Sequence, residues 1–200
     1  MAGIKLIAHA DTPLFSQSYL RDYVRVDDEI DDILIMDMGK AATNIIASRI
    51  GITVSASPST WRLALDQAPN SENPYIELLN PPIKSIDSVT TYSNDNTQSV
   101  VDPSNYYLDD FSIVPKLIFE NYNFPSNLRA VNAIEVEYTA GYMSLDDIPE
   151  GIKVAISEFF AFIYEHKGDD ETGIELRLTP AFFDNLRPYE VMRFNATVYD

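Results

Sequence analysis

Carboxylates are the side chains of this sequence that could most readily do chemistry, and they are densest between residues 27 and 32. Five of these six residues are acidic (DDEIDD). A calcium loop of the EF-hand type requires alternating oxygen ligands, a central glycine and a distal glutamate, and no glycine lies between Val26 and Ile33. We therefore interpret the run as the start of a helix, where acidic side chains complement the exposed backbone amides.

The other candidates for catalysis are isolated. His9 and His166 lack the second histidine four residues away that a zinc-binding helix has, and we expect His166 to contact carbonyl groups at a helix end. Glu135 and Glu137 share one strand face, as paired acid and base carboxylates could, but solvent-facing residues of a half-buried strand have the same spacing. Since the sequence has no cysteine, no glycine-rich phosphate loop and no G-x-S-x-G motif, we expect no enzyme, cofactor or metal site.

The composition indicates a folded, strongly acidic protein. The chain has 200 residues, is 46% hydrophobic and carries a formal net charge of −17, which together exclude a disordered acidic tail and predict about one domain. Binding DNA through its phosphates requires clustered lysine and arginine, and the sequence has no such cluster. The first ten residues are too short an apolar stretch for a membrane span or a signal peptide, so we expect a soluble protein with no membrane partner.

The positions of the prolines divide the chain into helical and strand-rich parts. Eight of the twelve prolines lie between Pro58 and Pro125, and none lies in residues 14–57 or 150–179. Because an interior proline breaks a helix, we expect helices at about 16–50 and 149–167 and a strand-rich insertion at about 58–142. Within the insertion, alternating apolar residues predict about six short strands, at 61–65, 75–79, 83–92, 106–108, 117–119 and 134–138.

The first helical window has two apolar lines. Ser16 is a candidate cap for a short helix, and a long helix is expected from Asp27 to about Ile50, ended by Gly51. One line, which we assign to the core, contains Ile30, Leu34, Met38, Ala41 and Ile45. The second line contains Ile35, Ala42 and Ile46. Two lines indicate either a deeply buried helix or one between its own core and a neighbouring subunit, so Ile35, Ala42 and Ile46 are the candidate self-association face.

The C-terminal residues form a candidate arm. Residues 177–200 contain three arginines and three acidic residues, so this segment is neutral, and it is rich in large apolar side chains. Such a terminus either folds back onto its own core or docks on a partner. If the segment docks on a partner, its candidate contacts are Phe183, Leu186, Arg187, Tyr189, Arg193 and Phe194.

Seven motifs follow one another along the chain: residues 19–27 (YLRDYVRVD), 82–89 (PIKSIDSV), 105–108 (NYYL), 134–142 (IEVEYTAGY), 148–153 (IPEGIK), 164–167 (YEHK) and 186–189 (LRPY). Taken in this order, they resemble the head-tail connector (adaptor or head-completion) proteins of tailed bacteriophages and gene transfer particles. The most specific of them is 134–142 followed by 148–153 and its helix.

The residue patterns predict a fold, and the resemblance implies a function. The expected fold is α+β, with N-terminal helices and a long central helix packed with a small antiparallel sheet or barrel in one domain, residues 1–178, and an extended docking arm, residues 179–200. The implied protein is a non-enzymatic dodecameric ring in the virion neck, assembled in the host cytoplasm. Its implied partners are the portal protein and a tail-side neck or stopper protein, with DNA only as passing cargo.

Two other readings of the residues stay open. One is an acidic, β-rich module that binds carbohydrate or protein through Trp61 and the tyrosines. The other is a glycosidase-like enzyme that uses paired carboxylates. A ring protein and a monomeric binding module differ in oligomeric state, which light scattering distinguishes.

Overall fold

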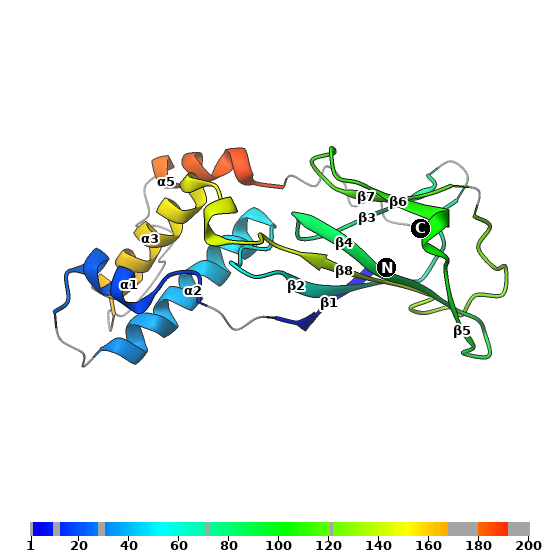
Figure 1. Cartoon of the computed structure of the whole chain (residues 1–200), viewed down its shortest axis with the longest axis horizontal. Coiled ribbons are helices and arrows are strands. Elements are labelled where there is room, and N and C mark those ends of the chain that lie inside the picture. Colours follow the sequence, from blue (N-terminus) through cyan, green and yellow to red (C-terminus); the bar gives the residue numbers. More distant parts are fainter. Residues whose placement is uncertain are drawn as a thin grey trace. The chain divides into compact units, whose positions relative to one another are not determined.

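The computed structural model describes residues 2–9, 13–27, 31–70, 73–120, 122–167 and 180–191. These residues form two compact units (Figure 1). Of the described residues, 2–9, 58–70, 73–120, 122–141 and 191 belong to the β unit, and 13–27, 31–57, 142–167 and 180–190 belong to the helical unit. The strand-rich segment is thus inserted between residues 57 and 142 of the helical unit. The sequence predicted a strand-rich insertion at about 58–142, within one domain.

The β unit consists of two antiparallel sheets. The five-stranded sheet has the order β1 (Ala2–Ala8), β2 (Ser59–Leu65), β8 (Ile134–Ala140), β4 (Ile83–Tyr92) and β5 (Gln98–Val100). The three-stranded sheet has the order β3 (Tyr75–Glu77), β7 (Lys116–Phe119) and β6 (Tyr106–Asp109). Strand β4 occupies the predicted range 83–92 and is irregular, because its register to β8 shifts at Ile83/Ser85 and again at Ile86/Ser88.

The core of the β unit follows from the alternation of β8. Ile134, Val136, Tyr138 and Ala140 are fully buried, whereas the residues between them are partly exposed, as expected for a strand with one face in the core. Tyr138 keeps its hydroxyl satisfied by donating a hydrogen bond to the Leu79 carbonyl over 2.9 Å. Apolar residues of both sheets join this cluster, so the two sheets share one core.

The helical unit is built from α1 (Gln17–Val24), α2 (Asp32–Ile50), α3 (Glu150–Glu165) and α5 (Pro180–Leu186). Helices α2 and α3 pack against each other, α1 contacts both, and α5 contacts α3. Short 3-10 turns lie at Pro103–Asn105 in the β unit and at Leu145–Asp147 and Arg187–Tyr189 in the helical unit. The predicted α+β class is confirmed.

The helix ends show how local sequence positions these elements. Ser16 Oγ accepts a hydrogen bond from the Tyr19 amide over 3.2 Å, and Gly51 ends α2 with a left-handed φ of 73°, both as predicted. Helix α3 begins at Glu150 with Pro149 as its cap, one residue after the predicted start at about 149. Helix α2 begins at Asp32 instead of Asp27, and residues 28–30 of the acidic run lie outside the described residues.

Candidate interaction site

Helix α2 has an orientation opposite to the one predicted. Ile35, Ala42 and Ile46, the residues assigned to the ring interface, are at most 2% exposed and lie in the core of the helical unit. Of the line assigned to the core, Leu34 is 38% and Ile45 is 50% exposed. Since a buried side chain offers no surface to another subunit, a ring interface on this helix has to use the exposed line, and its existence stays a prediction.

Small residues explain why this face of α2 is buried. Gly39 lies on it, and a Cβ there would stand 2.6 Å from Leu20 Cδ1, so the absence of a side chain allows Leu20 of α1 to approach the helix. Thr43 is also buried and donates its hydroxyl hydrogen bond to the Gly39 carbonyl over 2.9 Å. The buried face is therefore the one that contains a glycine and a threonine, which hydrophobic spacing alone does not reveal.

The exposed line on α2 is the first candidate interaction surface. We call Leu34, Ala41 and Ile45 the α2 stripe; they lie within about 40° of one another around a helix that turns 100° per residue. All three are exposed. Ile33 is 81% exposed as well, but it lies about 100° from Leu34 around the helix axis and is not part of the stripe.

The described part of the C-terminal arm folds back onto the helical unit. Phe182 and Leu186 are 6% and 3% exposed, and the Phe182 ring lies 6.4 Å from that of Phe159 in α3. The Arg49 guanidinium lies 5.7 Å from the centre of the Phe183 ring. Leu186 is thus a core residue of this unit and not a free docking anchor, which corrects its assignment. The fold-back alternative holds for residues 180–189.

Some of the arm residues keep an accessible surface. Arg187 is exposed and pairs with Asp184, with Nε 3.4 Å from Oδ1, while Phe183 and Tyr189 are half-buried. The Tyr189 hydroxyl stands 2.7 Å from the position that a Cβ on Gly151 would occupy, so this glycine makes room for the turn that follows α5. Arg193 and Phe194 lie outside the described residues.

The start of α2 is joined to the end of α3 by polar contacts. Asp31 accepts hydrogen bonds from Tyr164 Oη over 2.9 Å and from Lys167 Nζ over 2.6 Å. These bonds, that of Lys167 first, lower the pKa of Asp31 below its ordinary value of 3.8, and the same contact raises the pKa of Lys167. His166 contacts the Phe162 carbonyl with its Nδ1 at 2.8 Å, as predicted. Part of the acidic run therefore stabilises the fold.

The paired carboxylates on β8 are bound by arginines. Arg62 Nε donates to Glu137 Oε1 over 2.8 Å, and Arg129 Nη2 donates to Glu135 over 3.4 Å. Tyr92 Oη also donates to Glu135 over 3.2 Å, and burial followed by the charge of Glu135 raises the pKa of this phenol. The cluster ties three strands and a loop together, which favours the structural interpretation of Glu135 and Glu137.

Trp61 is half-buried and packs on the core of the β unit. Among the residues that the structure describes, no group of three histidine or acidic side chains could hold a metal ion. Within the same residues, no helix is both long and apolar enough to cross a membrane.

Comparison with known families identifies the chain's relatives. The model of the family described as "Head completion protein" matches residues 13–174. Because this match spans most of the chain, the chain belongs to the head completion protein family. This confirms the family that the sequence motifs resembled. No curated protein matches the sequence.

The fold occurs in solved structures of gene transfer agent (GTA) particles. A chain in "Neck of empty GTA particle computed with C6 symmetry" has a TM-score of 0.79 at 16% identity, covering 97% of this chain and 98% of that chain. A chain in "Virion of native gene transfer agent (GTA) particle" has a TM-score of 0.74 at 15% identity, covering 96% and 97%. A chain in "Neck of native GTA particle computed with C12 symmetry" has 0.69 at 17%, covering 96% and 98%. The likeness extends over both units.

Proposed function

We propose that this chain is a head-tail connector: a structural component of the virion neck that forms a ring beneath the portal, joins the capsid to the tail and lets DNA pass. The observation that carries the proposal is the head completion family match over residues 13–174. The shared fold of chains from GTA necks supports the same location. One of these necks was computed with C12 symmetry, which supports a ring of twelve copies.

The proposed ring contacts use the surfaces that the fold leaves exposed. The α2 stripe (Leu34, Ala41 and Ile45) supplies an apolar face for a neighbouring subunit, because exposed apolar patches on folded proteins mark interaction sites. The accessible residues near the C-terminus bind the portal, with Phe183, Arg187 and Tyr189 as contacts. Aromatic and arginine side chains are the types that contribute most to binding energy at interfaces.

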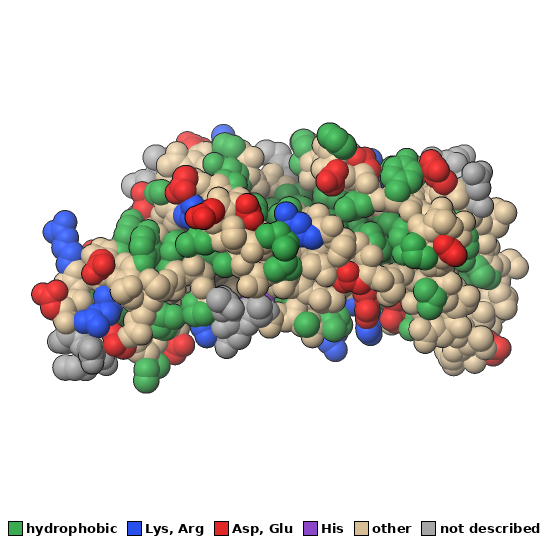
Figure 2. All heavy atoms as spheres, in the orientation of Figure 1, with side chains coloured by type: hydrophobic (Ala, Val, Ile, Leu, Met, Phe, Trp, Pro, Cys, Tyr) green, Lys and Arg blue, Asp and Glu red, His purple; other side chains and the backbone are tan. Residues whose placement is uncertain are grey.

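The charge of the chain suits a channel through which DNA moves. At −17 per chain, a ring repels a polyanion instead of holding it. On the face drawn in Figure 2, acidic side chains are spread over both units, and the basic side chains are scattered and form no continuous patch. A tail-side neck or stopper protein is the proposed second partner, with assembly in the host cytoplasm.

Portal binding is the property to test first. The purified chain is mixed with the portal protein of the same particle, and the complex is weighed by mass photometry. We expect the portal mass to increase by about twelve chains. A portal mass that stays unchanged at high chain concentration would contradict the proposal.

A further inference from the structure

Strand β1 is an edge strand with one free side. It lies at one end of the five-stranded sheet, and among the described residues β2 is the strand that pairs with it. Its antiparallel pairing starts at Ala2, and His9 Nδ1 lies 3.0 Å from Ser59 Oγ just beyond its other end. The amide and carbonyl groups on the free side of β1 are therefore held in an ordered row, which is the template on which an extended segment adds a strand.

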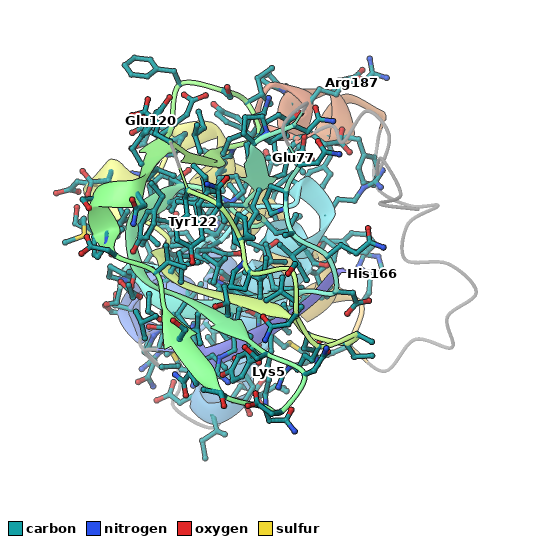
Figure 3. The ribbon with its side chains drawn as sticks, turned by 90° about the vertical axis from the view of Figure 1, so that its right-hand side faces the viewer. Lys5, Glu77, Glu120, Tyr122, His166 and Arg187 are labelled. Carbon is teal, nitrogen blue, oxygen red and sulfur yellow. The ribbon has the colours of Figure 1, made fainter. Side chains whose placement is uncertain are left out.

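The apolar layer of this sheet extends past its cover at β1. Ile4 lies directly opposite Leu63, so Ile4 and Leu6 are on the side of the sheet that faces the core. Leu63 is 1% exposed, whereas Ile4 is 38% and Leu6 is 41% exposed. In Figure 3, Lys5 of β1 lies in the lower part of the view and Glu77 of the three-stranded sheet in the upper part. The cover of the core thus ends at β2 and leaves the apolar side of β1 open.

The last residues of the chain have the sequence pattern of a strand that fits this edge. They are residues 192–200 (MRFNATVYD), which lie outside the described residues. Apolar and polar side chains alternate from Met192 to Val198, which is the period of a strand with one apolar face. Pairing with β1 would place this apolar face beside Ile4 and Leu6.

Length distinguishes β1 from the other free sheet edges. Strand β1 has seven residues, whereas β5 and β3 have three each and β6 has four. The segment 192–200 contains nine residues (200 − 191). It is long enough to pair along the whole of β1, and it would extend well past the end of each of the other edges.

The position of the segment favours the same copy as the source of the added strand. Val191, the last described residue, belongs to the β unit, so the segment starts in the unit that contains β1. A short tether gives a high effective concentration, which a separate copy or another protein lacks. Residues 174–178 (IELRL) also alternate, but they connect α3 to α5, so both of their ends are fixed in the helical unit.

From these observations we propose that residues 192–200 pair with the free side of β1 of their own copy and form a sixth strand of this sheet. Their apolar side chains cover Ile4 and Leu6, and the pairing closes an edge that is otherwise a template for aggregation. Arg193 and Phe194 are thereby assigned to the β unit instead of to portal docking. The inference goes beyond the proposed function and does not depend on it.

Hydrogen–deuterium exchange of the unassembled chain tests for this strand. The full chain is compared with a chain truncated after Val191, and exchange is measured in peptides that contain β1. We expect the amides on the free side of β1 to exchange about tenfold or more faster in the truncated chain, because they lose their hydrogen-bond acceptors. Strand β5, the other edge of the same sheet, is the internal control and should exchange equally in both chains. Equal exchange of β1 in the two chains would overturn the inference.

Two point variants of the full chain test whether the apolar face holds the segment in place. Phe194→Asp puts a carboxylate on this face and should speed the exchange of β1 as the truncation does. Asn195→Asp adds the same charge to the polar face and should leave the exchange unchanged. The inference is overturned if the two variants behave alike, or if the protection of β1 falls on dilution, which would identify a second copy as the occupant. Assembly on the portal is measured separately, so either result leaves the proposed function standing.

Discussion

Asp31 shows how a single carboxylate stabilises the helical unit. Its bonds to Tyr164 and Lys167 join α2 to the end of α3, and they hold the pKa of Asp31 below 3.8. A carboxyl group whose pKa is lower in the folded than in the unfolded chain stabilises the folded state at pH values above its unfolded pKa. This stabilisation is lost as the pH falls through the pKa of the folded state.

We therefore predict a pH-dependent effect of Asp31→Asn. The variant should melt below the parent at pH 7, and the difference should shrink as the pH is lowered below 3.8. Thermal melts followed by circular dichroism at several pH values measure this, with Asp37→Asn on the exposed side of α2 as the matched control. An equal melting temperature at pH 7 would show that the contact contributes nothing.

Buried and exposed residues of α2 should respond differently to the same charge. Ala42→Glu places an unpaired carboxylate at a position with no exposed surface, so it should prevent folding or cost several kcal/mol. Ile45→Glu, at a half-exposed position, should leave the melting temperature nearly unchanged and weaken assembly on the portal. Assembly that is unaffected by Ile45→Glu would remove the α2 stripe from the ring interface.

At the scale of elements, α5 is an integral part of the helical unit. Phe182→Ala removes a ring that is 6% exposed and should lower the free energy of unfolding by about 3 kcal/mol or more. Phe111→Ala, the same substitution at a solvent-exposed position, is the control and should change it by less than about 0.5 kcal/mol. Denaturant titrations compare the two. If Phe182→Ala behaves like the control, α5 is a detachable arm.

The elements also show what the sequence can predict. Proline positions correctly separated the helices from the strands, because proline is incompatible with a helix interior wherever it occurs. The orientation of α2 was not predictable from spacing, since both of its lines are apolar and the decisive residues, Gly39 and Thr43, do not look like core residues. Strands β1 and β5 were missed, because both lie at sheet edges and expose apolar side chains such as Ile4 and Val100.

The assignment of Leu186 to docking is wrong for a different reason, since this residue is buried in the helical unit. The apolar residues of the arm were compatible both with folding back and with docking, and the resemblance to connector proteins shifted the assignment toward docking. Contacts between distant segments, such as that of Phe182 with Phe159, depend on tertiary packing that no local pattern encodes.

At the scale of the whole molecule, charge should set the behaviour of the chain toward DNA. With a net charge of −17, the purified protein should bind duplex DNA more weakly than about 10⁻⁴ M even in low salt, because its sequence has no cluster of lysine and arginine to displace counterions. Fluorescence anisotropy with a labelled DNA duplex, repeated at roughly 20 mM to 200 mM salt, measures the dissociation constant and its dependence on salt. Tight binding that weakens steeply with salt would contradict a channel along which DNA slides.

Assembly on the portal is the central claim, and electron cryomicroscopy of the portal incubated with this chain tests it most directly. The account predicts a ring of this fold, coaxial with the portal and with an open channel, in which residues near α5 contact the portal. Portal particles that carry no added ring at saturating chain concentration, or that carry the chain as isolated copies with no contact between neighbours, would contradict it.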